Sequence, residues 1–139
     1  MYKKIIYTSF FDNIKDLSDD EYFFVCIRGD HPKWFKGYIC KPLIPRWSWW
    51  SQWDALPKNT PEEYYEADWF YRDCYREMVL SNLTPRRVIS DLESLAVKRK
   101  IVFICGEIPP EFCHRRIIDE WLSKSGYVVE ELDYVRENV

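Results

Sequence analysis

A short apolar run near the C-terminus constrains the fold more than any other feature of this chain. Residues 101–104 are Ile-Val-Phe-Ile, and the two residues before them are Arg99 and Lys100. An unbroken apolar run that follows charge is typical of a strand buried on both faces of a parallel sheet. Residues 111–124 then carry apolar side chains at helical spacing, and Gly126 follows as a helix stop. A buried strand followed by an amphipathic helix predicts an α/β fold.

The rest of the chain alternates in the same way. Three further segments are rich in β-branched and aromatic residues and are predicted strands: residues 3–7, 22–27 and 127–132. Two more helices should begin at Thr60 and Thr84, because each threonine precedes a proline at the first helical position; the first should extend to about Leu80. We therefore expect residues 1–139 to form one three-layer, Rossmann-like α/β domain with a mostly parallel sheet and right-handed crossovers.

Composition and charge argue against several classes of partner and location. The net charge of −3 argues against nonspecific binding to duplex nucleic acid, which needs a basic face. The chain contains no apolar run of the ~18 residues that span a membrane, and its first residues lack the apolar core of a signal peptide. The five cysteines form an odd set without disulfide-like spacing, which suits a reducing compartment. We expect a cytoplasmic protein without a membrane partner.

Reactive side chains gather between the apolar run and the helix that follows it. Cys105, Glu107, Cys113, His114 and Arg115 lie around one predicted turn. A helix N-terminus favours anions and lowers the pKa of a nearby thiol, so Cys113 or Cys105 is a candidate nucleophile or redox-active thiol. His114 is a candidate acid/base or hydrogen-bond donor, and Glu107 is a candidate to orient it or act as general base. Core filling for Cys105 and a structural role for His114 remain the alternatives.

Metal and cofactor sites are not favoured by spacing. Cys105, Glu107, Cys113 and His114 are the right ligand types for zinc, but the step of eight residues between the two thiols is not that of a structural zinc site. The four glycines form neither a dinucleotide fingerprint nor a phosphate-binding loop. We expect no metal and no cofactor. Cys74 lies on the predicted apolar stripe of a helix, so we expect a structural role for it.

Two further candidates follow the predicted strands at residues 3–7 and 22–27. Ser9 and Arg28 come directly after these strands. If the strands run parallel to the one at residues 101–104, all three carboxyl ends meet at one edge of the sheet, where α/β proteins bind ligands. Ser9 and Arg28 would then line the same pocket as Cys105. Arg28 could equally be a surface residue at a turn.

Tryptophans crowd into a segment that we expect to be a loop at about residues 41–59. Four of them lie beside Arg46, namely Trp47, Trp49, Trp50 and Trp53. Together with Trp34, the rings of Trp49 and Trp50 could stack on a base or nucleotide ring. They could instead form a protein interface, where tryptophan is enriched. The third interpretation is that they fold back onto the sheet as a lid or satellite core.

The motif Cys105-x-Glu107, followed after five residues by Cys113-His114-Arg115, resembles the signature of the family of domains of unknown function numbered 488. Other segments resemble one branch of that family in the same order: residues 6–9, 13–17, 32–37, 79–81 and 119–121. The resemblance implies a compact Rossmann-like α/β domain with the Cys/His/Arg turn in its pocket. It supplies no activity. The tryptophan-rich stretch at residues 46–53 departs from the family pattern and leaves the pocket mouth undefined.

Three hypotheses of function follow. The first is a pocket for a small anionic, nucleotide-like ligand, in which Arg115 contacts the anion, His114 donates a hydrogen bond and tryptophans cover the ring. The second is a thiol-dependent enzyme that acts on such a ligand. The third is an adaptor that docks a protein partner through the tryptophan-rich loop.

Overall fold

The computed structural model describes residues 5–45, 47–105 and 114–132. Its centre is a five-stranded sheet in which every pair of neighbouring strands is parallel, with the order β3-β2-β4-β1-β5. The strands are β1 (Ile5–Phe10), β2 (Tyr22–Cys26), β3 (Tyr38–Ile39), β4 (Lys100–Cys105) and β5 (Val128–Glu131). The apolar run at residues 101–104 is fully buried within the central strand β4. This architecture confirms the predicted Rossmann-like α/β fold.

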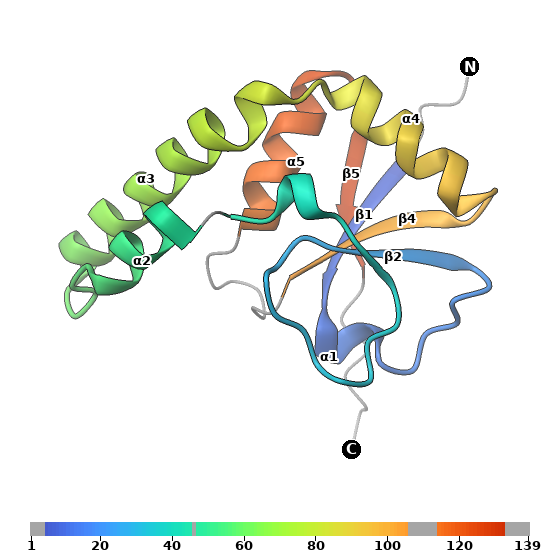
Figure 1. The fold of residues 1–139 in the computed structure, drawn as a ribbon, viewed down its shortest axis with the longest axis horizontal. Coiled ribbons are helices and arrows are strands. Elements are labelled where there is room, and N and C mark those ends of the chain that lie inside the picture. The colour runs from blue at the N-terminus through green and yellow to red at the C-terminus, as the bar shows by residue number, and fades with distance from the viewer. Residues whose placement is uncertain (1–4, 46, 106–113, 133–139) are drawn as a thin grey trace.

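Helices cover the two faces of the sheet unequally. They are α1 (Phe11–Ile14), α2 (Trp47–Ala55), α3 (Pro61–Met78), α4 (Pro85–Ala96) and α5 (His114–Lys124), with short 3-10 turns η1 (Lys41–Leu43) and η2 (Leu80–Asn82). Buried residues of α2 to α5 pack with Ile6, Val25 and Phe103 on one face, which we call the helical face. Phe11 and Ile14 of α1 pack with Val102 and Ile104 on the other, which we call the α1 face. Figure 1 shows α1 on the opposite side of the strands from α3 and α4.

Local signals set the helix ends where the sequence predicts them. The Thr60 hydroxyl accepts a hydrogen bond from the Glu63 backbone N–H at 3.1 Å, which caps α3 ahead of Pro61. Gly126 adopts a φ of +93° after α5, a conformation that costs glycine little. The amide of Tyr127 then donates to the Leu122 carbonyl at 3.2 Å and closes the end of α5.

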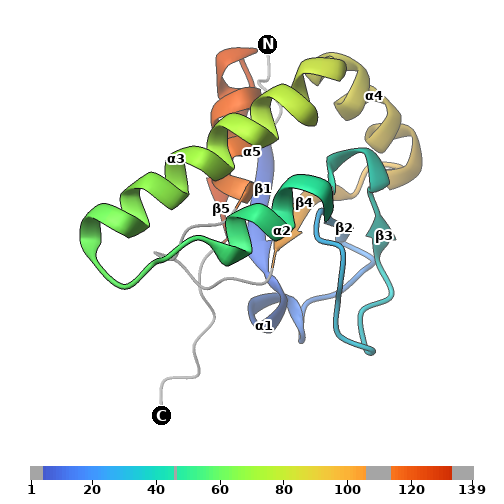
Figure 2. The ribbon, with the colours of Figure 1, turned by 60° about the vertical axis from the view of Figure 1, so that its left-hand side comes forward.

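The tryptophan-rich segment is not the irregular loop that we expected. Residues 41–43 form η1, and residues 47–55 form α2. Trp49 and Trp53 are spaced by one helical turn, and their ring centroids lie 5.2 and 5.1 Å from that of Tyr71 on α3. Lys58 stabilises the end of α2, because its ammonium donates to the carbonyls of Trp53 and Leu56 at 2.8 and 2.9 Å. Figure 2 shows α2 and α3 packed side by side.

Candidate ligand site at the carboxyl edge of the sheet

The two strands that carry Ser9 and Cys105 lie next to each other, and their chains leave the sheet in opposite directions. Strands β1 and β4 are parallel neighbours, with Phe10 opposite Cys105. After β1 the chain enters α1 on the α1 face, whereas after β4 it continues to α5 on the helical face. Open α/β sheets bind ligands at such a topological switch point, because the diverging connections leave a crevice beyond the strand ends. The candidate site therefore lies at the carboxyl ends of β1 and β4.

A buried polar pair lies at this switch point. Ser9 is fully buried, and its hydroxyl accepts a hydrogen bond from the side-chain amide of Asn13 at 2.9 Å. Asn13 belongs to α1 and is itself 4% exposed. Ser9 was predicted at this edge, and the parallel strands confirm that position. Asn13 was not predicted as a site residue, because it lies on a helix and Ser9 on a strand, so no sequence period relates the two.

Cys105 ends the central strand and is disulfide-bonded in this structure. The side chain is 1% exposed, and its alternation with Ile101 and Phe103 places it on the helical face. The five cysteines lack disulfide-like spacing, so the sequence did not predict this bond. Spacing along the chain says little about a disulfide, because proximity in the fold decides whether two cysteines can bond. A disulfide-bonded Cys105 carries no thiolate that could attack a ligand.

Three other cysteines are free, and none is poised as a nucleophile. They are Cys26, Cys40 and Cys74. Burial raises the pKa of the Cys40 thiol to about 11. Burial also raises the pKa of Cys26 and of Cys74, and the carboxylates of Asp73 and Glu77 raise that of Cys74 further. Cys74 packs against the core of the helical face, as expected for a structural residue.

The second half of the predicted motif falls partly outside the described residues. Glu107 and Cys113 lie outside the described ranges. His114 and Arg115 are the first two residues of α5, which agrees with the prediction that they lie in the first turn of this helix. Their side chains, and that of Trp50 in α2, are likewise outside the description. The roles of these residues stay predictions.

The loop after β2 brings an aromatic ring and an ion pair to the same edge. Trp34 is 38% exposed, and its ring meets that of Phe11, the first residue of α1, edge to face with centroids 6.3 Å apart. Arg28 lies two residues beyond the end of β2, and its Nε donates to Asp30 at 2.6 Å. Both residues were predicted to line the ligand site. His31 lies in the same loop, and its ring centroid is 5.7 Å from that of Phe35.

Trp49 is not a cover for a ligand. Its side chain is 2% exposed and lies in the core of the helical face, where its ring meets those of Tyr71 and Tyr75 edge to face. The prediction that Trp49 contacts a ligand was therefore wrong. The third interpretation, in which the tryptophans build a satellite core, holds for Trp49 because Tyr71 and Tyr75 of α3 offer a ring-sized apolar surface. Sequence spacing does not reveal that surface.

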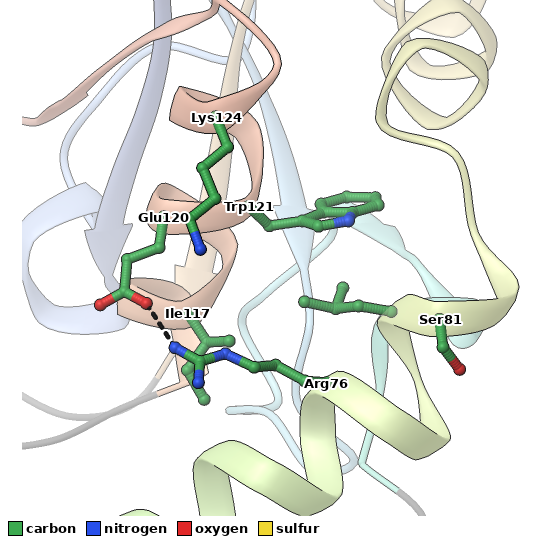
Figure 3. A pocket seen from close by; sticks show the side chains of 7 residues that line it. Arg76, Ser81, Ile117, Glu120, Trp121 and Lys124 are labelled. Carbon is green, nitrogen blue, oxygen red and sulfur yellow. Dashed lines mark hydrogen bonds and ion pairs between the residues drawn. The ribbon is translucent and has the colours of Figure 1, made fainter.

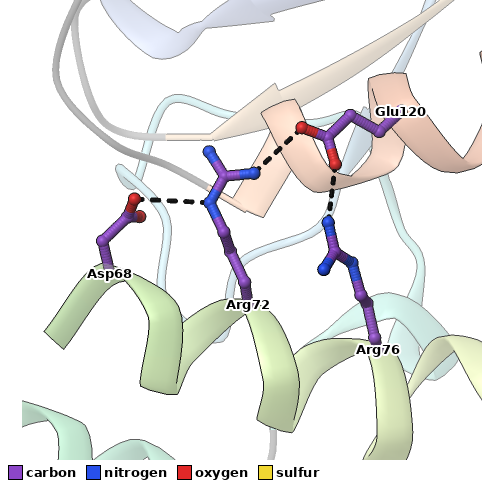
Figure 4. Close-up of polar contacts among 4 residues, drawn as sticks. All are labelled: Asp68, Arg72, Arg76 and Glu120. Atoms are coloured by element: carbon purple, nitrogen blue, oxygen red, sulfur yellow. Dashed lines mark hydrogen bonds and ion pairs between the residues drawn. The ribbon is translucent and has the colours of Figure 1, made fainter. Parts of the chain in front are cut away.

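A hollow between α3 and α5 lies away from the predicted residues. Its volume is about 210 Å³, and it is lined by Arg76, Leu80, Ser81, Ile117, Glu120, Trp121 and Lys124. Figure 3 draws these side chains and labels all of them except Leu80. Beside it, Glu120 of α5 accepts hydrogen bonds from Arg72 and Arg76 of α3 (Figure 4). Arg72 also binds Asp68 at 3.3 Å. This network holds α3 against α5 and contains none of the residues predicted for the site.

Within the described ranges, no three histidine, cysteine or acidic side chains come together as a metal site would require. Over the same ranges, no helix has the length and apolar character needed to cross a membrane. No family model, curated protein or solved structure matches the chain. The fold therefore defines the class on its own: this is an α/β protein with a Rossmann-like parallel sheet and a switch point between β1 and β4. The resemblance to the family numbered 488 stays a prediction based on the motif.

Proposed function

We propose that this domain binds a small anionic, nucleotide-like ligand at the carboxyl edge of its sheet, between β1 and β4. The observation that carries the proposal is the switch point itself, where two adjacent parallel strands end and their connections diverge to opposite faces. Ser9 and Asn13 add two buried polar side chains, hydrogen-bonded to each other, at the same strand end.

The parts of the proposed site have distinct roles. The backbone N–H groups at the start of α5 and the guanidinium of Arg115 would bind the anion, because a helix N-terminus and a charged donor both favour negative charge. His114 would donate a further hydrogen bond. Trp34, half exposed beside α1, is the ring best placed to stack on a base. Arg28 is held by Asp30, so we assign it to the rim of the site.

A thiol-dependent enzyme is the second candidate, and the disulfide at Cys105 is the observation that favours it. Two equivalents of a small thiol would reduce this disulfide to two protein thiols and become one small disulfide. A freed thiolate could then attack the phosphorus of the bound ligand, so that an S–P bond forms as the P–O bond to the leaving group breaks, with His114 giving a proton to the leaving oxygen and water later cleaving the S–P bond. Cys105 itself is buried, so attack by Cys105 would require the strand end to open.

The binding proposal is tested by isothermal titration calorimetry with inorganic phosphate and with nucleoside mono- and diphosphates. Arg115→Ala should weaken binding by roughly tenfold or more, because a charge-assisted hydrogen bond contributes about 1.5–3 kcal/mol. Arg116→Ala is the matched control, since Arg116 is the next residue of α5 and is exposed. Trp34→Leu should weaken the binding of nucleotides but not the binding of inorganic phosphate. Equal losses for Arg115→Ala and Arg116→Ala, or no binding by any member of this series, would refute the proposal.

The thiol candidate is tested by alkylation and mass spectrometry. The protein denatured without reductant should carry labels on Cys26, Cys40 and Cys74 but not on Cys105. After reduction, Cys105 should also be labelled. If Cys105 is labelled without reductant in protein purified under air, the disulfide does not form and this candidate loses its support. Cys113→Ser should abolish turnover of a nucleotide substrate while binding is kept.

A further inference from the structure

The side of α3 opposite its buried stripe carries an exposed aromatic pair. The buried stripe is Ala67, Tyr71 and Tyr75. On the other side, Tyr65 is 62% exposed and Trp69 is 42% exposed, and their rings meet edge to face with centroids 6.1 Å apart. Trp and Tyr supply much of the binding energy at protein interfaces, because they bury a large area with few rotatable bonds. The pair has the residue types and the exposure of anchor residues at a protein interface.

Acidic side chains surround the pair. Helical spacing places six exposed residues on this side, which we call the α3 outer face: Glu62, Tyr65, Glu66, Trp69, Asp73 and Glu77. None of its four carboxylates makes an ion pair with another described residue. The two basic residues of α3 are instead engaged by Glu120. The aromatic pair is therefore framed by uncompensated negative charge.

The α3 outer face is also open to a large partner. In Figure 1 the N-terminal half of α3 extends past the strands, with α2 beside it. The contacts of α3 with α2 run through Tyr71, and those with α5 run through Arg72 and Arg76. The contact with α2 lies on the buried stripe, whereas the contact with α5 borders the aromatic pair, since Arg72 follows Trp69 by three residues. Both contacts leave Tyr65 and Trp69 exposed.

We propose that the α3 outer face docks a basic segment of a protein partner. Arginine and lysine side chains of that segment would lie over the rings of Tyr65 and Trp69, where the negative faces of the rings attract cations. The same side chains would pair with Glu62, Glu66 and Asp73 around them. This surface lies on the helical layer and contains none of the residues assigned to the ligand site.

Charge selects this occupant over a second copy of the chain. A symmetric dimer through the α3 outer face would bring the same carboxylates together, and like charges in contact are repulsive. A nucleic acid or an anionic membrane would meet the same repulsion. A basic partner alone gains from both the rings and the carboxylates.

The probe is a fluorescein-labelled synthetic peptide of twelve residues in which Arg or Lys alternates with Leu or Ala. Its binding to the full chain is measured by fluorescence anisotropy. The titration is done at about 50 mM and at about 300 mM salt, because these ionic strengths differ strongly in how they screen charges. One variant carries Glu62→Gln, Glu66→Gln and Asp73→Asn. Its matched control carries Asp16→Asn, Asp19→Asn and Asp20→Asn, which removes the same charge from exposed positions elsewhere. A second variant, Trp69→Ala, is paired with Leu95→Ala, another exposed apolar residue.

The α3 variant should bind the peptide at least tenfold more weakly at low salt, and its control should change less than twofold. Trp69→Ala should weaken binding about fivefold at both salt concentrations, as expected for a ring at an anchor position, and Leu95→Ala should not. Three results would overturn the proposal: equal losses of peptide affinity in the two charge variants, an unchanged affinity in Trp69→Ala, or no binding of the peptide at all. A wild-type dimer in sedimentation velocity that Trp69→Ala converts to monomer would also overturn it, because a second copy would then occupy the face. Circular dichroism confirms that each variant is folded.

Discussion

Arg76 of α3 donates a hydrogen bond from Nη2 to Oε2 of Glu120 in α5 at 2.8 Å, across 44 residues of sequence. The other carboxylate oxygen of Glu120 accepts from Arg72 at 2.9 Å. One carboxylate on α5 is thus held by two guanidinium groups on α3, as Figure 4 shows. Burial alone would raise the pKa of Glu120, but the hydrogen bonds and charges of Arg72 and Arg76 together lower it.

Glu120→Gln should lower the free energy of unfolding by about 1 kcal/mol, because the side chain of Glu120 is 43% exposed and solvent screens its ion pairs. Urea unfolding at neutral pH measures the change. Glu130→Gln, an exposed residue on β5, is the control and should change stability by less than about 0.5 kcal/mol. Equal losses from the two substitutions would show that the pairs with Arg72 and Arg76 add nothing.

The same carboxylate predicts how stability depends on pH. Because the pKa of Glu120 is lower in the folded state than the ordinary value of 4.5, the unfolded chain binds a proton first as the pH falls. The stabilisation is therefore complete above pH 4.5 and is lost as the pH falls through the lowered pKa. The stability difference between wild type and Glu120→Gln should shrink between neutral pH and the acid range. A difference that stays constant on acidification would contradict this assignment.

Asn13→Ala should destabilise the protein by about 2 kcal/mol. The substitution leaves the buried hydroxyl of Ser9 without its amide donor, and an unsatisfied buried polar group costs about 1–3 kcal/mol. Asp12→Ala is the control, since Asp12 is exposed on the same short helix. Thermal unfolding by calorimetry compares the two. If Asn13→Ala also weakens the nucleotide titrations described above, the pair shapes the proposed site as well as the core.

Trp49 should tolerate phenylalanine far better than alanine. Its indole N–H is buried without a hydrogen-bond partner, so Trp49→Phe removes ring volume but breaks no hydrogen bond. We expect a loss of about 1 kcal/mol for Trp49→Phe and about 3–5 kcal/mol for Trp49→Ala, measured by urea unfolding. Trp69→Ala, at an exposed position, should be nearly neutral in the same assay. A small loss for Trp49→Ala would show that the ring is not a core residue in solution.

The sequence alone predicted much of the scaffold and the location of the candidate site. The apolar run at residues 101–104 identified the central strand, Thr60 and Pro61 located the start of α3, and Gly126 located the end of α5. Ser9 and Arg28 were placed at one edge because they were predicted at the carboxyl ends of strands that proved parallel; Ser9 lies one residue before the end of β1 and Arg28 two residues beyond β2. These features depend on periodicity, capping and chain direction, which are encoded within a few neighbouring residues.

Tertiary structure decided the rest. The position of β4 between β2 and β1 creates the switch point, and no local pattern specifies which strands become neighbours. The sequence left Trp49 open to a ligand, an interface or a core, and only the fold shows that Tyr71 and Tyr75 supply the surface that buries it. Glu120 and Arg76 are paired only because α3 and α5 pack on the same face of the sheet. Burial and pairing of this kind depend on which surfaces meet, and residues far apart in the sequence meet only once the chain has folded.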